Sequence, residues 1–184
     1  MKKIFFNIKN EKFFFFVLIV YFSIGLNVFD DYGISWDEVN ERFSGFVSLN
    51  EIYKIFGLEP FTGPNVELSN GNILKTEYPA LSDYIYKEYG VIFNLPLAFL
   101  ESFFEIKDVK EVFLLRHFVN FLIFFISTIF FYYTLRNFYS KIISIIGFLF
   151  LILSPRIFAE SFYNNKDIIF LSLYLIAFYF TLKF

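Results

Sequence analysis

The residues of this chain that are best suited to chemistry are ionisable side chains placed beside apolar segments. Asp37 and Glu38 follow the first segment, and Arg116 lies about one turn inside the second. The link between the third and fourth segments carries Arg156, Glu160, Lys166 and Asp167. Because charges at membrane depth are costly, such residues are candidates for a functional site rather than for simple packing.

Four apolar segments separate these charged groups and predict membrane-spanning helices. They are residues 13–29, 112–135, 142–155 and 168–182. The first contains no charge and, as a helix, is about 26 Å long at roughly 1.5 Å per residue. The whole chain is 57% hydrophobic and 25% aromatic, which excludes an ordinary soluble domain. The sequence therefore predicts an all-α polytopic membrane protein with about four transmembrane helices.

The distribution of charge predicts the orientation of these helices. Residues 30–111 hold 15 acids and 6 bases, whereas the rest of the chain holds 10 bases and 3 acids. By the positive-inside rule, the N-terminal lysines and the link 136–141 are cytoplasmic, and the acidic loop 30–111 is external. A cleaved signal peptide is disfavoured, because no small-x-small site follows the first segment. All the candidate site residues then lie at the external face, which favours a site for an anionic, polar substrate.

The external loop is predicted to contain structure of its own. Residues 59–65 and 69–72 are rich in turn-forming residues. Residues 90–104 are apolar but contain Asn94 and Pro96, and they are short for a span, so we expect a helix lying in the outer membrane interface. No internal repeat or linker divides the chain, which favours a single domain.

Each candidate residue also has a purely structural interpretation. Ser35-Trp-Asp-Glu38 fits a capping box, in which Glu38 serves only the start of a helix. Arg116 also fits a side chain that extends to lipid headgroups, and His117 fits an interfacial residue. Lys166 and Asp167 fit an ion pair at a helix start, and Trp36 fits an interface anchor.

Three short motifs, in this order along the chain, resemble a family. Residues 34–45 (ISWDEVNERFSG) resemble the first-loop Asp-Glu motif of the protein O-mannosyltransferases and the lipid A aminoarabinose transferases, which are GT-C membrane glycosyltransferases. Residues 113–120 resemble the arginine-bearing start of that family's second span, and residues 154–167 resemble its second outer loop. The resemblance covers nearly the whole chain, but only the Asp-Glu motif is fairly specific.

The resemblance implies transfer of a sugar from a polyprenyl-phosphate carrier to a lipid, glycan or protein acceptor on the periplasmic face of the bacterial inner membrane. It implies that Asp37 is the general base and that Glu38 orients the acceptor. Arg116 is implied to hold the carrier phosphate, with help from Lys166, and Glu160 or Asp167 to be the acid of the second loop.

The chain departs from the family in its length, since the family's enzymes have many more spans. We therefore expect an N-terminal portion of such an enzyme, one that need not be active alone. No cofactor is predicted, although a divalent metal stays open, and the absence of cysteine excludes thiolate metal sites. A transporter piece or a non-catalytic membrane assembly protein are the alternatives, and membrane lipids are expected partners in every case. A nucleic-acid partner is disfavoured, because the only large loop is acidic.

Overall fold

The computed structural model describes residues 11–59, 66–67, 73–74, 78–106 and 108–183. Within these residues the protein is helical apart from one short hairpin, so the all-α class is confirmed. The predicted turns at 60–65 and 69–72, and the lysines of residues 2–9, lie outside the described residues.

The chain divides into two compact units. We call residues up to Gly33 together with those from His117 onward the bundle unit, and Ile34–Arg116 the loop unit. The boundary falls inside helix α4 (Val109–Phe138), which runs without a break from one unit into the other. This division therefore does not test the expectation of a single domain.

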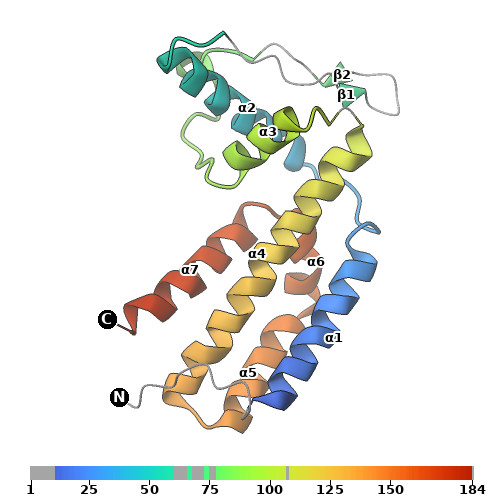
Figure 1. Ribbon diagram of the computed structural model, residues 1–184, viewed down its shortest axis with the longest axis vertical. Coiled ribbons are helices and arrows are strands. Elements are labelled where there is room, and N and C mark those ends of the chain that lie inside the picture. Colours follow the sequence, from blue (N-terminus) through green and yellow to red (C-terminus); the bar gives the residue numbers. More distant parts are fainter. Residues whose placement is uncertain (1–10, 60–65, 68–72, 75–77, 107, 184) are drawn as a thin grey trace. The chain divides into compact units, whose positions relative to one another are not determined.

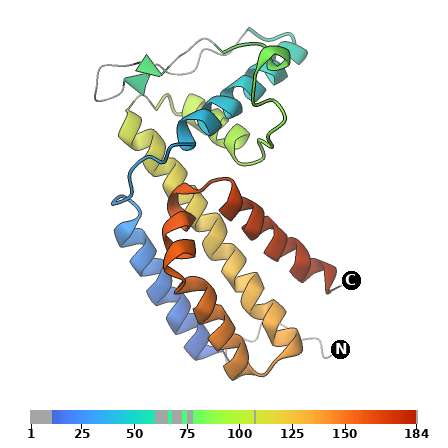
Figure 2. The same cartoon turned by 180° about the vertical axis from the view of Figure 1, so that it is seen from behind.

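The bundle unit consists of α1 (Lys12–Val28), most of α4, α5 (Lys141–Ile152), α6 (Pro155–Tyr163) and α7 (Asp167–Thr181). Within it, α4 lies between α7 on one side and α1 with α6 on the other (Figures 1 and 2). The core is largely aromatic. Phe14 of α1 stacks on Tyr132 of α4 at 3.7 Å between ring centroids, and Phe121 stacks on Phe162 of α6 at 5.0 Å.

Helix α1 approaches α4 closely because Gly25 has no side chain. A Cβ atom at this position would lie 2.0 Å from Cζ of Phe121, so only glycine fits against that ring. The periodic placement of Phe14, Leu18, Tyr21 and Gly25 puts all four on the buried face of the helix.

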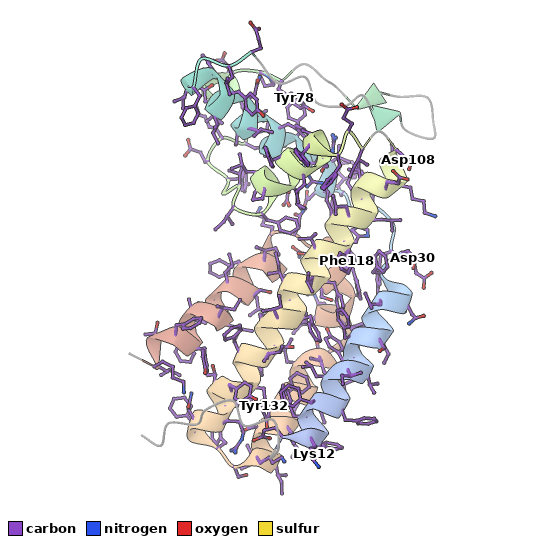
Figure 3. All side chains as sticks on the ribbon, viewed as in Figure 1. Lys12, Asp30, Tyr78, Asp108, Phe118 and Tyr132 are labelled. Atoms are coloured by element: carbon purple, nitrogen blue, oxygen red, sulfur yellow. The ribbon has the colours of Figure 1, made fainter. Side chains whose placement is uncertain are left out.

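At one end of the bundle unit, two basic side chains pair with the same acid, Glu11. The Glu11 carboxylate accepts a hydrogen bond from the Tyr132 hydroxyl at 2.6 Å, and it lies 3.4 Å from Nε of Arg136 and 3.6 Å from Nζ of Lys141. Lys12 and Tyr132 mark this end in Figure 3. Glu11 thereby joins the ends of three helices that the sequence predicts to be cytoplasmic.

The third predicted span differs from the structure at its end. The segment 142–155 was expected to be one helix followed by a link, but α5 stops at Ile152 and a new helix, α6, starts at Pro155 after a bend of 60°. Proline cannot donate the backbone hydrogen bond that a continuing helix needs, but it fits the first turn of a new one. The predicted external link thus contains a helix.

Within the described residues, α4 is the one helix that is both long and apolar enough to cross a membrane by itself. The bent pair of α5 and α6 meets the same standard if the two are counted as one span. Helices α1 and α7 are apolar but shorter, with 17 and 15 residues.

The loop unit is built on α2 (Glu38–Ile55) packed against α3 (Asn94–Phe103), with the first turns of α4 completing it. A short antiparallel hairpin, β1 (Val66–Glu67) and β2 (Ile73–Leu74), and a 3-10 turn, η2 (Leu81–Asp83), connect α2 to α3. A helix was predicted within residues 90–104, and α3 confirms that it exists.

Candidate functional site

The predicted Asp-Glu motif starts helix α2, and its two carboxylates have opposite environments. Asp37 is exposed to solvent immediately before the helix, whereas Glu38 is only 1% exposed. Oε2 of Glu38 accepts a hydrogen bond from the backbone N–H of Ser35 at 2.6 Å. This is the glutamate half of the capping box, so Glu38 has a structural role at the helix start.

Arg116 is buried and bonded within the loop unit. Its side chain is 1% exposed, so the alternative of an arginine that extends to lipid headgroups is wrong. Nε donates to Oε1 of Glu101 at 2.7 Å, and Nη1 donates to Oδ1 of Asn94 at 2.9 Å. Two residues of α3 therefore fix the guanidinium of α4 in one orientation.

Glu101 also binds a second arginine. Nε of Arg42 on α2 donates to Oε2 of Glu101 at 2.7 Å, so the two oxygens of one carboxylate each bind a different guanidinium. We call Arg42, Asn94, Glu101 and Arg116 the ionic cluster; each is at most 5% exposed. Because its members come from α2, α3 and α4, the cluster ties together the three helical segments of the loop unit.

The ionic cluster has more donors than its own acceptors satisfy. Nη2 of Arg116 forms an ion pair with Oε1 of Glu101 at 2.6 Å, the oxygen that also accepts from Nε, but this contact does not have hydrogen-bond geometry. Nη2 of Arg42 is buried without a hydrogen-bond partner among the described residues. Glu38 lies near enough for its charge to act on Arg116. Two guanidinium groups and two carboxylates thus balance in charge, yet N–H groups remain that an anionic oxygen would satisfy.

Tyr78 lies close to the arginine of α2. Its ring stacks on Phe46 with centroids 5.1 Å apart, and Arg42 lies 4.6 Å above the same Phe46 ring. Figure 3 marks Tyr78 in the loop unit. Burial of its hydroxyl raises the pKa of Tyr78 to about 12, although the positive charge of Arg42 acts in the opposite direction.

The candidates from the predicted link between the third and fourth segments lie in the bundle unit. Glu160 pairs with Arg156, with 2.8 Å between Oε1 and Nε. Asn164 organises the start of α7: its Oδ1 accepts the backbone N–H of Asp167 at 2.9 Å, and its Nδ2 donates to Oδ2 of Asp167 at 3.2 Å. The backbone N–H of Lys166 also donates to Oδ1 of Asn164, at 3.3 Å. These contacts explain Asp167 as part of a helix start.

Two further polar residues of α4 are buried inside the bundle unit. His117, which was expected at the interface, is only 1% exposed. Asn120 lies four residues after Arg116 on α4, and its Nδ2 donates to the backbone oxygen of Ser161 on α6, at 3.1 Å. Asn120 therefore joins α4 to α6 and is not a member of the ionic cluster.

The structure thus groups the predicted site residues in two sets. Asp37, Glu38 and Arg116 belong to the loop unit, and Glu160, Lys166 and Asp167 belong to the bundle unit. Sequence reasoning missed three members of the ionic cluster: Arg42, Asn94 and Glu101. A signal existed for Glu101, the single charge in an apolar segment, because a buried carboxylate requires a cation or several donors.

Acidic and histidine side chains do not form a ready metal site in the part of the chain that the structure describes. No group of three or more His, Cys, Asp or Glu residues is placed to hold an ion there. The features that remain for chemistry are the exposed Asp37 and the donors of the ionic cluster.

Comparisons with known proteins return no match: no family model, no curated protein and no solved structure is similar to this chain.

Proposed function

We propose that this chain has the function of a GT-C-type membrane glycosyltransferase. In this proposal it contributes to the transfer of a sugar from a polyprenyl-phosphate carrier to a lipid, glycan or protein acceptor at the periplasmic face of the bacterial inner membrane. The observation that carries the proposal is the contrast within the Asp-Glu motif. Asp37 is exposed, while the neighbouring Glu38 is fixed in the interior of a unit that also holds Arg116 rigidly.

The solvent-exposed carboxylate of Asp37 suits the role of a general base. In the proposed reaction it takes the proton from the acceptor hydroxyl while that oxygen forms a bond to the anomeric carbon of the sugar. The bond between the anomeric carbon and the phosphate oxygen breaks, and the carrier phosphate leaves with the electron pair. Asp37 ends the step protonated and then releases the proton to water.

The ionic cluster suits the stabilisation of the leaving phosphate. The Nη2 groups of Arg42 and Arg116 are the donors of the cluster that lack hydrogen-bond partners in the described structure. A fixed guanidinium binds phosphate oxygens well, and it costs no reorganisation when negative charge develops. Glu160, Lys166 and Asp167 have no role in this proposal, because they belong to the bundle unit, where Glu160 pairs with Arg156 and Asp167 bonds to Asn164.

The proposed topology has four spans with the N-terminus in the cytoplasm. Helices α1, α4 and α7 each cross the membrane, and α5 with α6 forms the remaining bent span. Helices α1 and α7 are about 26 and 23 Å long, against roughly 30 Å for the hydrocarbon core, a mismatch that local thinning of the bilayer accommodates. The basic end at Arg136 and Lys141 is then cytoplasmic, and the acidic loop unit is external.

The variant Asp37→Asn tests the base assignment, since it keeps the shape of the side chain but removes its basicity. The whole gene product is reconstituted in vesicles with a radiolabelled polyprenyl-phosphate sugar and an acceptor extract. We expect transfer to fall about 10²- to 10⁴-fold, the usual contribution of a general base. Asp83→Asn, which alters another exposed acid of the loop unit, is the matched control and should retain activity. Full activity of Asp37→Asn would show that another group is the base.

A non-catalytic role in membrane assembly is the second candidate function, and one observation favours it. Glu101 and Asn94 already neutralise and orient Arg116, as expected for a residue that only holds helices together. The two functions differ in carrier binding. If polyprenyl phosphate fails to bind the reconstituted protein and the protein shows no transfer, the assembly role is the better explanation.

A further inference from the structure

Helix α3 buries its one charged residue beside Leu97 and Ala98, and its exposed side chains are all apolar. Glu101, its only ionisable residue, is buried in the ionic cluster together with Asn94. The opposite face carries Pro96, Phe99 and Phe103, all exposed, and Ile92 lies one turn ahead of them. A helix on a protein surface in water shows the reverse arrangement, with its charged residues facing the solvent.

The exposed apolar residues of α3 form one stripe. Positions 96, 99 and 103 recur at spacings of three and four, so they share one face of α3, and Ile92 lies in the turn before the helix. Phe99 and Phe103 stack with their centroids 6.1 Å apart, and Phe104 meets Phe103 edge-on at 5.2 Å. Phe103 is 70% exposed and Ile92 is 71% exposed. A continuous aromatic surface of this kind indicates a partner of low polarity.

The position of α3 along the chain identifies that partner. The hydrogen bond from Arg116 to Glu101 holds α3 beside the first turns of α4, the helix that is long enough to cross a membrane. Between Arg116 and Arg136, α4 contains no Asp, Glu, Lys or Arg. That stretch is about 28 Å long, close to the roughly 30 Å of the hydrocarbon core, so the two arginines mark its edges. Helix α3 therefore lies at the level of a membrane boundary, where aromatic side chains gather.

We infer that α3 lies in the outer membrane interface with Pro96, Phe99 and Phe103 in contact with lipid acyl chains. This inference rests on the membrane location that is part of the proposed function, and it adds a lipid surface as the partner of the loop unit. It also gives a reason for the ionic cluster. With one face in lipid, the other face of α3 must keep its charged residue among cations of the protein, because an unpaired carboxylate near hydrocarbon is costly.

The chain's single tryptophan allows a direct test by fluorescence quenching. Trp36→Phe provides a background without tryptophan, into which Phe103→Trp places one fluorophore at the exposed end of the stripe. The whole chain is reconstituted in phosphatidylcholine vesicles with and without brominated acyl chains, and iodide is added to the water. We expect about twofold quenching by the brominated lipid and little by iodide, as for side chains inserted roughly 5–10 Å into the interface.

Two reference positions in the same background make the test specific. Ser82→Trp places the fluorophore on an exposed turn of the loop unit, where iodide should quench it more strongly than brominated lipid does. Phe16→Trp places it on the exposed face of α1, where brominated lipid should quench it if the protein spans the membrane. Thermal unfolding of each variant checks that the substitution at its exposed site leaves the fold intact.

The outcomes separate this inference from the proposed function. If residue 103 is quenched by iodide and not by brominated lipid, the stripe lies in water and the inference fails. If neither agent quenches it, a protein surface covers the stripe, and the inference fails as well. Quenching at residue 16 without quenching at residue 103 refutes only the lipid contact of α3, whereas no lipid quenching at residue 16 refutes the membrane location and the proposed function with it.

Discussion

The two units of this chain have interiors of different chemistry. In the bundle unit, aromatic rings fill the core, as in the stack of Phe14 on Tyr132, and its ion pairs around Glu11 lie at one end. In the loop unit, a smaller apolar core lies beside buried charged groups, and Arg42 and Arg116 share Glu101. Aromatic packing is a sum of many weak contacts, whereas the ionic cluster depends on a few directional bonds.

Because of this difference, the two units should lose stability through different kinds of substitution. Removal of one ring from a packed core leaves a cavity whose cost depends on how far the neighbours relax. Removal of one partner from a buried ion pair leaves an uncompensated buried charge. The stability lost in this way exceeds the net stability that the intact pair contributed. The loop unit should therefore depend strongly on single charged residues, whereas the cost of one lost ring in the bundle unit should vary with how far its neighbours relax.

The largest effect is expected from Glu101→Ala. It leaves two buried guanidinium groups without their carboxylate, so we expect the loop unit to lose about 3–5 kcal/mol of stability. Thermal unfolding in detergent, followed by circular dichroism, and limited proteolysis between residues 34 and 116 both measure this loss. Glu88→Ala, which removes an exposed acid of the same unit, is the matched control and should change stability by less than about 0.5 kcal/mol. Equal effects of the two variants would contradict the idea that the loop unit depends on its ionic cluster.

A smaller effect is expected where α2 and α3 touch. A Cβ atom at Gly45 would lie 2.4 Å from the backbone oxygen of Asn94, and backbone cannot rotate away, so Gly45→Ala should cost about 1–3 kcal/mol. In the bundle unit, a Cβ atom at Gly147 would lie 2.6 Å from Cδ1 of Leu135, the end of a flexible side chain. Gly147→Ala should therefore lower the melting temperature less than Gly45→Ala does. Gly33→Ala, with nothing within 4 Å of the new atom, is the control.

The smallest effect concerns pH. Because burial raises the pKa of Tyr78 from 10.0 to about 12, the folded loop unit keeps this proton when the unfolded chain has lost it. The stabilisation is fully present below pH 10 and falls as the pH rises from 10 to about 12. Tyr78→Phe should reduce the loss of stability in this window. Unfolding measured at a series of alkaline pH values, with Tyr86→Phe as an exposed control, checks it; an unchanged pH profile for Tyr78→Phe would count against the burial of its hydroxyl.

Much of the fold follows from local patterns in the sequence. Apolar stretches of sufficient length predicted helices at 13–29, 112–135 and 168–182, and α1, α4 and α7 lie there. The third predicted helix, 142–155, was wrong at its end. Helix α5 stops at Ile152, and α6 begins at Pro155, because the proline ends one helix and starts the next. The helix α3 was predicted from its composition, although Asn94 was interpreted as an interruption and not as a ligand of an arginine.

The sequence by itself determined which segments are apolar, where most of the apolar helices lie and where the acids and bases concentrate, because these properties depend on neighbours along the chain. Only the tertiary structure decided which charges meet. Arg42, Glu101 and Arg116 are separated by 59 and 15 positions and come from three helices, so no periodicity connects them. Burial decided the rest: it separated the exposed Asp37 from the enclosed Glu38, since the protection of a side chain from water depends on which distant segments pack over it.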